Sequence, residues 1–163
     1  FFSNPIRLAQ TAAFGAALLL AIAYVFEALG YAPCQMCLWQ RYPHGFAVLI
    51  GITILITRKR GFIGLGAFAC FTTAGIGIFH SGVEQKWWDG PTSCSNKTNS
   101  LSGVSGEDLL STNIIDKMVM CDEISWAFMS LSMPTWNAII SALLGIIWVT
   151  SFICLGSTKK VID

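Results

Sequence analysis

Charge is scarce in this sequence. Lys, Arg, Asp and Glu make up 12% of the 163 residues, and the formal net charge is +1. There is no clustered basic face of the kind that binds nucleic-acid phosphates, so a nucleic-acid partner is excluded. Hydrophobic residues make up 54% of the chain and the mean hydropathy is positive. This composition excludes an ordinary soluble domain and indicates a membrane protein.

Formal charge is absent from four apolar stretches. The length of each is compared with the roughly 20 residues that a helix needs to cross the hydrocarbon. They are residues 8–26, 42–57, 61–80 and 135–155. The second is short unless residues 38–41 lie in the interface, and the third is rich in glycine, which predicts close helix packing. The first lacks a short apolar region ending at a cleavage site, so we expect it to be retained. We therefore predict an all-α membrane protein, a single domain over residues 1–163 folded as a four-helix transmembrane bundle.

Basic residues predict the orientation of these spans. They cluster before the first span, between the second and third, and at the end of the chain: Arg7, Arg58, Lys59, Arg60, Lys159 and Lys160. Since Lys and Arg favour the cytoplasmic side, both termini are expected to be cytoplasmic. The opposite side then carries two loops, residues 27–41 and 81–134. The second loop holds seven of the nine acidic residues.

The six cysteines separate by their predicted depth. Cys34 and Cys37 lie in the first outer loop, and Cys94 and Cys121 lie in the second. Both pairs face a compartment in which disulfides form and persist. The other two, Cys70 and Cys154, fall within predicted spans and are interpreted as small buried hydrophobic residues.

Each outer pair has a structural and a redox interpretation. A Cys34–Cys37 bridge would close a loop of four residues, for which the chain-entropy model gives only about 2 kcal/mol. A CxxC pair more often has a lowered thiol pKa and exchanges readily, so redox use is favoured for it. Taken alone, the Cys94 and Cys121 pair fits a structural bridge as well as a redox role.

The residues around the CxxC motif favour a thiolate. Arg41 would share a helical face with Cys37, where its guanidinium would stabilise the negative charge. An interfacial arginine that reaches the lipid headgroups is the alternative. Pro33 suits the first position of a helical turn whose free N–H groups would stabilise an anion at Cys34 or Cys37. Pro43 predicts a kink or a restart just inside the second span.

Two segments carry a resemblance to a known family. The first is Cys34-Gln-Met-Cys37-Leu-Trp-Gln-Arg41-Tyr-Pro43, and the second runs from Cys121-Asp-Glu-Ile-Ser-Trp126 to Met-Pro134-Thr-Trp136-Asn. They resemble the CxxC-x3-R segment and the stretch leading into the last helix of the DsbB family of disulfide bond formation proteins. The order of helices and loops along nearly the whole chain is also similar.

This resemblance implies a function and a set of site residues. It implies a bacterial inner-membrane oxidoreductase that reoxidises a periplasmic thioredoxin-fold dithiol oxidase of the DsbA type and reduces membrane quinone, either ubiquinone or menaquinone. Cys94 would be attacked by the partner, with Cys121 as the leaving thiol. Cys121 would then engage Cys34, leaving Cys37 as the thiolate that meets the quinone. Arg41 would stabilise the developing negative charge.

Two residues at the end of the third span are further candidates. His80 would lie near the quinone headgroup, with an ordinary interfacial histidine as the alternative. Glu84 is a weaker candidate there. The segment after Ser105-Gly-Glu-Asp108 repeats Leu110, Ile114 and Met118, which predicts a short amphipathic helix on the membrane or on the protein.

Two rival functions remain open from the sequence. Vitamin K epoxide reductase relatives share a four-helix redox architecture, but their CxxC follows the loop cysteines, whereas here it precedes them. A thiol-based metal-binding or transport protein would use Cys34, Cys37, Cys94 and Cys121 as a tetrahedral site. The lack of clustered histidines or carboxylates in the spans disfavours this second rival, and no metal is expected.

Overall fold

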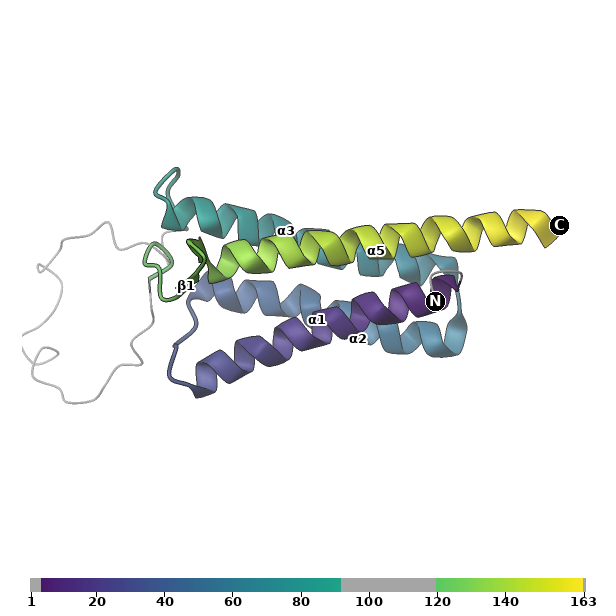
Figure 1. The fold of residues 1–163 in the computed structure, drawn as a ribbon, viewed down its shortest axis with the longest axis horizontal. Helices are drawn as coiled ribbons and strands as arrows, with labels where there is room; N and C mark the ends of the chain where they lie inside the picture. Colours follow the sequence, from purple (N-terminus) through teal and green to yellow (C-terminus); the bar gives the residue numbers. More distant parts are fainter. Residues whose placement is uncertain (1–3, 92–119, 163) are drawn as a thin grey trace, which may run out of the picture.

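Four long helices run side by side in the computed structural model, which describes residues 4–91 and 120–162 (Figure 1). They are α1 (Pro5–Ala28), α2 (Gln35–Thr57), α3 (Arg60–Glu84) and α5 (Met133–Ile162). Within the described ranges, the other elements are the strands β1 (Ala127–Phe128) and β2 (Leu131–Ser132), which pair antiparallel just before α5. The helical architecture is as predicted, whereas the small hairpin was not predicted. Cys94 and the segment expected to form a helix over residues 110–118 lie outside the described residues.

Three of the described helices are long and apolar enough to cross a membrane: Pro5–Ala28, Arg60–Glu84 and Met133–Ser157. The protein is therefore a multi-pass membrane protein. The second helix, α2, is less apolar than these three because Gln40, Arg41 and His44 lie in its first half. It nevertheless packs against both α1 and α3 along the bundle. That α2 is a fourth span stays a prediction.

The start of α2 differs from the expectation. The helix begins at Gln35 with Cys34 as its N-cap, so residues 38–41 are helical and Pro33 lies before the helix. Pro33 was wrongly predicted to occupy the first helical position. The helix also continues through Pro43 to Thr57, so the restart predicted at this proline is absent. A side-chain N-cap supplies the start signal instead, because the cysteine sulfur accepts a backbone N–H that the helix leaves unpaired.

Glycines let α3 approach its neighbour closely, as predicted. A Cβ built on Gly66 would lie 2.7 Å from the ring of Trp148, and one on Gly77 would lie 3.0 Å from the backbone oxygen of Pro134. Real Cβ atoms do not come so close to a buried ring. Helices α3 and α5 can therefore pack at this distance only because these positions are glycine. Gly75, in the same helix, faces open space. Cys70 is fully buried in this core, whereas Cys154 is only partly buried.

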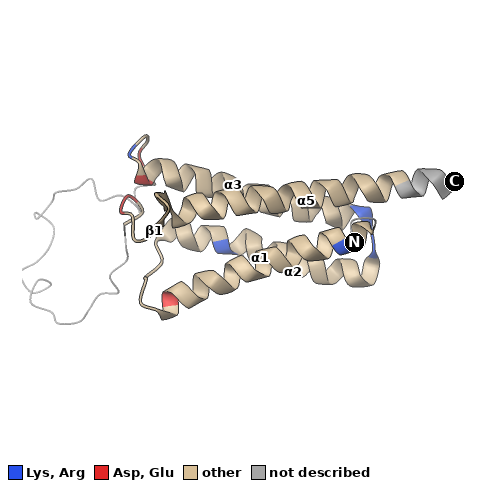
Figure 2. Cartoon of the chain, viewed as in Figure 1, with Lys and Arg blue, Asp and Glu red and all other residues tan. Residues whose placement is uncertain are grey.

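The outer surface of the bundle is apolar along its length and charged only toward its ends. Large side chains such as Phe14 and Ile56 are exposed on the helices, as lipid-facing residues are. Figure 2 shows acidic residues gathered at the end that carries the hairpin and most of the basic residues at the other end. We call the hairpin end the loop end; it contains Glu27, Glu84, Asp89, Asp122 and Glu123. The asymmetry agrees with the predicted charge pattern, and the side of the membrane that each end faces stays a prediction.

Candidate active site

Three cysteines from two separate segments meet at the loop end. Cys34 caps α2, Cys37 lies in its first turn, and Cys121 comes from the segment before the hairpin. Together with Met36 and Val83 they form one packed cluster, in which Cys34 and Cys121 are 4% and 1% exposed. The Sγ atoms of Cys34 and Cys37 lie 2.9 Å apart, and the side chains of Cys34 and Cys121 are hydrogen-bonded. Thiol exchange between the two segments is therefore sterically possible without a large displacement.

Local geometry favours a negative charge on this CxxC pair. The backbone N–H of Cys37 donates to Cys34 Sγ over 3.2 Å, and both sulfurs lie at the positive N-terminal end of α2. The pair precedes the apolar part of α2, which begins at Tyr42. The hydrogen bond from the Cys34 thiol lowers the pKa of Cys37. The side-chain hydrogen bonds with Cys121 and then Cys37 raise the pKa of Cys34. The first proton lost from the reduced pair therefore leaves the charge on Cys37.

A histidine from α3 completes the cluster. His80 is 2% exposed, and its Nε2 lies 3.5 Å from Cys34 Sγ. Its Nδ1 lies 3.1 Å from Gln40 Nε2, which also donates to the backbone carbonyl of Met36. A carbonyl only accepts, so the amide nitrogen of Gln40 is assigned to this side, and His80 Nδ1 must accept from it. The remaining hydrogen of a neutral His80 is then on Nε2, where it can donate to the Cys34 sulfur.

Arg41 is held by α1. Its guanidinium forms a 2.5 Å ion pair with the carboxylate of Glu27 and lies 4.7 Å above the ring of Tyr24. The Arg41 side chain is only 13% exposed. It borders the same cavity as Cys37, four residues earlier on the helix. The structure thus brings Arg41 near the thiols, with an acidic partner that the sequence analysis did not identify.

A cavity of about 410 Å³ opens beside the cysteine cluster, within the size range of small-molecule sites. Its walls are mostly apolar and aromatic, including Phe26, Trp126 and Trp136. Trp126 packs edge-on against Phe26, with ring centroids 5.2 Å apart. The polar groups that line it are Cys34, Cys37, Gln40, Arg41, His44, His80, Glu84, Glu123, Ser125 and Asn137. A pocket with mostly apolar walls and polar groups beside two thiols can hold a small, mostly apolar ligand.

Comparison with protein families identifies this arrangement. The family "Disulfide bond formation protein DsbB" matches residues 6–151 of the chain. The chain belongs to the DsbB family.

Several DsbB relatives are similar over most of their length. A "Disulfide bond formation protein B" of Xanthomonas oryzae is 32% identical over 151 residues, covering 83% of this chain and 86% of the relative. One of Xanthomonas campestris is 30% identical over 130 residues, or 76% of each chain. One of Polaromonas naphthalenivorans is 26% identical, with 87% of each chain covered. No solved structure gave a significant match.

Membership of the DsbB family makes this protein a disulfide-forming membrane oxidoreductase and confirms the resemblance of the two cysteine-bearing segments. It also disfavours the vitamin K epoxide reductase alternative. Of the four cysteines predicted to be catalytic, the structure brings together Cys34, Cys37 and Cys121, while Cys94 lies outside the described residues.

The same DsbB cluster could also hold a soft metal ion. Ligand atoms of Cys34, Cys37 and His80 all lie within 4.8 Å of one another. Thiolate and imidazole are the usual ligands of zinc. The metal-binding rival considered above used four cysteines, whereas here a histidine stands beside two of them.

Three polar residues of this DsbB site were not predicted from the sequence: Gln40, His44 and Asn137. Gln40 and His44 are 6% and 3% exposed although they lie in a membrane-embedded bundle. Polar residues spaced by four along an otherwise apolar helix were the available signal. Asn137, from α5, contacts both across the bundle.

Proposed function

We propose that this protein passes electron pairs from a periplasmic dithiol protein to membrane quinone through two cysteine pairs. The observation that supports this most strongly is the packing of Cys121 against Cys34 and Cys37 beside an aromatic-walled cavity. The packing provides an exchange route between the two loops, and the cavity provides a place for the acceptor. The partner is a thioredoxin-fold oxidase of the DsbA type, and the acceptor is ubiquinone or menaquinone.

The first half of the cycle is a series of thiol–disulfide exchanges. A partner thiolate attacks Cys94 of a Cys94–Cys121 disulfide, and Cys121 leaves as a thiolate. Cys121 then attacks Cys34 of the Cys34–Cys37 disulfide, and Cys37 leaves as a thiolate. The partner's second thiolate releases Cys94, which attacks Cys121, restores the Cys94–Cys121 bridge and frees Cys34. The partner is now oxidised, and the Cys34–Cys37 pair is reduced.

The second half returns these electrons to the membrane. The reduced pair loses two electrons and two protons as its disulfide forms again, and the quinone substrate gains both to become quinol. Cys37 is the sulfur that meets the quinone, because the first negative charge of the pair resides on it. Arg41 and His80 are the proposed quinone-site residues. Arg41 stabilises negative charge that develops at the cavity, and His80 donates to Cys34.

The basic end of the bundle is proposed to face the cytoplasm of a bacterial inner membrane. Both termini would then be cytoplasmic, and the cysteine-bearing loops, residues 27–41 and 81–134, would be periplasmic. With α2 as the fourth span, residues 1–163 form one domain.

The deciding experiment is oxidation of a reduced DsbA-type partner by the purified protein in detergent, with and without added quinone. We expect multiple turnovers only when quinone is present, together with quinol formed in a one-to-one ratio with the partner disulfide. The control variant is Cys70→Ala, which removes a cysteine that is buried in the helical core and lies outside the cysteine cluster. Turnover at an undiminished rate after complete removal of quinone would rule out the proposal.

A metal site is the second candidate, favoured by the cluster of Cys34, Cys37 and His80. Zinc measured in the purified, unreduced protein separates the two functions. Stoichiometric zinc that is lost in Cys34→Ala would favour the metal site, whereas its absence with quinone-dependent turnover favours electron transfer.

A further inference from the structure

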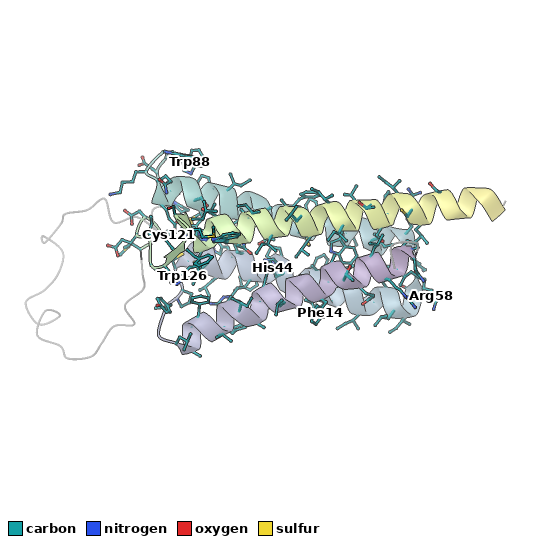
Figure 3. All side chains as sticks on the ribbon, in the orientation of Figure 1. Phe14, His44, Arg58, Trp88, Cys121 and Trp126 are labelled. Carbon is teal, nitrogen blue, oxygen red and sulfur yellow. The ribbon has the colours of Figure 1, made fainter. Side chains whose placement is uncertain are left out.

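A chain of hydrogen bonds runs through the bundle from His44 to the cysteine cluster. His44 Nε2 lies 2.9 Å from Asn137 Oδ1, and Asn137 Nδ2 donates to Gln40 Oε1 over 2.5 Å. Gln40 Nε2 then contacts His80 Nδ1, which leads to Cys34. These side chains come from three different helices. In Figure 3, His44 lies deeper in the bundle than Cys121 and Trp126.

Two backbone carbonyls determine which atoms donate and which accept in this series of hydrogen bonds. Gln40 Nε2 donates to the carbonyl of Met36, and the hydroxyl of Thr73 donates to the carbonyl of Gln40. Gln40 Oε1 must therefore face Asn137, and the lone pairs of Thr73 also face the Asn137 amide nitrogen, 3.4 Å away. Both contacts require Asn137 to turn Nδ2 toward them and Oδ1 toward His44. Asn137 Oδ1 is an acceptor, so His44 carries its hydrogen on Nε2.

This assignment leaves His44 with a bare acceptor. A neutral imidazole with hydrogen on Nε2 has only a lone pair on Nδ1. That Nδ1 is buried and has no hydrogen-bond partner within the described part of the chain. The whole residue is 3% exposed, yet it lines the cavity beside Cys37. Buried polar atoms are normally paired, so an unpaired acceptor on a residue that lines a cavity points to a donor on a ligand.

The spacing of His44 and Cys37 fits a ring with an oxygen at each end. They are seven residues apart on α2, which is about two turns and about 10 Å along the axis, on nearly the same face. This is the scale of a para-quinone ring with one contact beyond each oxygen. One oxygen can then meet the thiol end of the cavity while the other meets His44.

We propose that His44 Nδ1 accepts a hydrogen bond from the hydroxyl of the quinol that lies farther from Cys37. This inference rests on the quinone reaction proposed above. A quinone carbonyl has no hydrogen to donate, so the bond forms only once that oxygen has gained a proton. His44 neither gains nor loses a proton and adds no reactant. It makes the site hold quinol more tightly than a site with an apolar residue would.

Two substitutions of His44 separate ligand binding from support of the polar chain. In His44→Gln, Nε2 can still donate to Asn137, but the acceptor at the Nδ1 position is gone. In His44→Asn, Oδ1 can occupy the Nδ1 position, but the donor to Asn137 is lost. A ligand-binding role therefore predicts that Asn retains quinol binding and Gln does not. A purely structural role predicts the opposite order.

The test is binding of durohydroquinone and duroquinone to the purified full chain, followed by tryptophan fluorescence, because Trp126 and Trp136 line the cavity. Durohydroquinone is added to reduced protein and duroquinone to oxidised protein, without oxygen, so that neither probe reacts. We expect His44→Gln to weaken durohydroquinone binding about 3- to 10-fold, the effect of one hydrogen bond, and to leave duroquinone binding unchanged. His44→Asn should bind durohydroquinone within about 2-fold of wild type.

Three results would overturn the inference: unchanged durohydroquinone binding in His44→Gln, equal weakening of both probes, or weakening in His44→Asn alone. Thermal unfolding of each variant identifies a general loss of structure. If wild-type protein binds neither probe, the quinone function itself fails, which distinguishes that outcome from failure of the role of His44.

Discussion

Cys121 packs against Cys34 although the whole of α2 and α3 separates them in the sequence. The contact joins the segment before the hairpin to the N-cap of α2. Thiol–disulfide exchange between the two loops can therefore take place between side chains that are already packed together. It also buries both sulfurs, which protects them from other thiols.

The outer cysteines should be individually necessary, and the two remaining ones should not. Ser substitution of Cys34, Cys37, Cys94 or Cys121 is expected to abolish quinone-dependent partner oxidation because each breaks one exchange step. Cys70→Ala and Cys154→Ala should retain most activity, since neither belongs to the packed cluster. Initial rates with a fixed partner concentration check this. Full turnover in Cys34→Ser would contradict the proposed transfer of electrons through Cys34.

The partner should dock on residues 87–94 and become trapped there. Pro91 favours an extended conformation at Gly90, and Cys94 follows three residues later in the sequence. A reduced partner that keeps only its attacking cysteine can open the Cys94–Cys121 disulfide, with Cys121 leaving as a thiolate, but cannot release Cys94 afterwards, so a mixed disulfide between Cys94 and this partner should accumulate. Non-reducing gels followed by peptide mapping would detect it. A partner found on Cys34 would reverse the assignment of the two pairs.

Thiol reactivity should distinguish the two cysteines of the CxxC motif. The pKa of Cys37 is lowered by the hydrogen bond from Cys34, so its thiolate persists at a lower pH than that of an ordinary cysteine. Alkylation of Cys37 in the reduced protein should therefore fall off only as pH drops below the midpoint of a model thiol. Mass spectrometry after brief iodoacetamide treatment across a pH series measures this. Cys34→Ala removes the hydrogen bond and should move the Cys37 midpoint upward; no movement would assign the low pKa to another cause.

Two glycines of α3 should respond oppositely to a methyl group. Gly66→Ala places a Cβ 2.7 Å from the Trp148 ring and is expected to destabilise the protein by about 1–3 kcal/mol. Gly75→Ala meets open space and should be neutral or slightly stabilising, because alanine favours a helix. Thermal unfolding in detergent compares the two. Equal melting temperatures would mean that α3 and α5 can move apart at little cost.

The sequence predicted the helices and the family better than the contacts between helices. Four uncharged stretches predicted the helical bundle, and the two cysteine-bearing segments, together with the order of helices and loops, carried the resemblance to the family. The apolar span was predicted to begin seven residues after the start of α2, because Gln40 and Arg41 interrupt the apolar pattern, and Pro33 was predicted as a first helical position two residues before that start. An N-cap cysteine is not a common start signal. The hydrogen bonds of Gln40 and His44 with Asn137 join residues far apart in sequence, so periodicity could not reveal them.

Arg41 should act on the quinone half of the cycle. It lies on the same helix as Cys37, borders the same cavity and is mostly shielded from solvent, where weaker screening strengthens the effect of its charge. Arg41→Met should lower the apparent quinone affinity by about 10-fold, while Arg41→Lys keeps the charge without the planar fork and should retain part of the activity. Formation of the Cys94 mixed disulfide should be nearly unchanged in both.

The ion pair with Glu27 provides the matched control for Arg41. Glu27→Gln removes the carboxylate charge but leaves the guanidinium over Tyr24, so the arginine keeps its charge near the cavity. If Arg41 serves the quinone step, Glu27→Gln should affect quinone dependence far less than Arg41→Met does. If Arg41 merely fastens α2 to α1, the two variants should lose stability and activity in parallel. Quinone titrations, single-turnover reactions with reduced partner and thermal unfolding should be measured for all three variants. If Arg41→Met slows only the reaction with the partner and leaves the quinone dependence intact, Arg41 acts in partner docking. The positive charge of Arg41 would then no longer support quinone binding in the cavity beside Cys37.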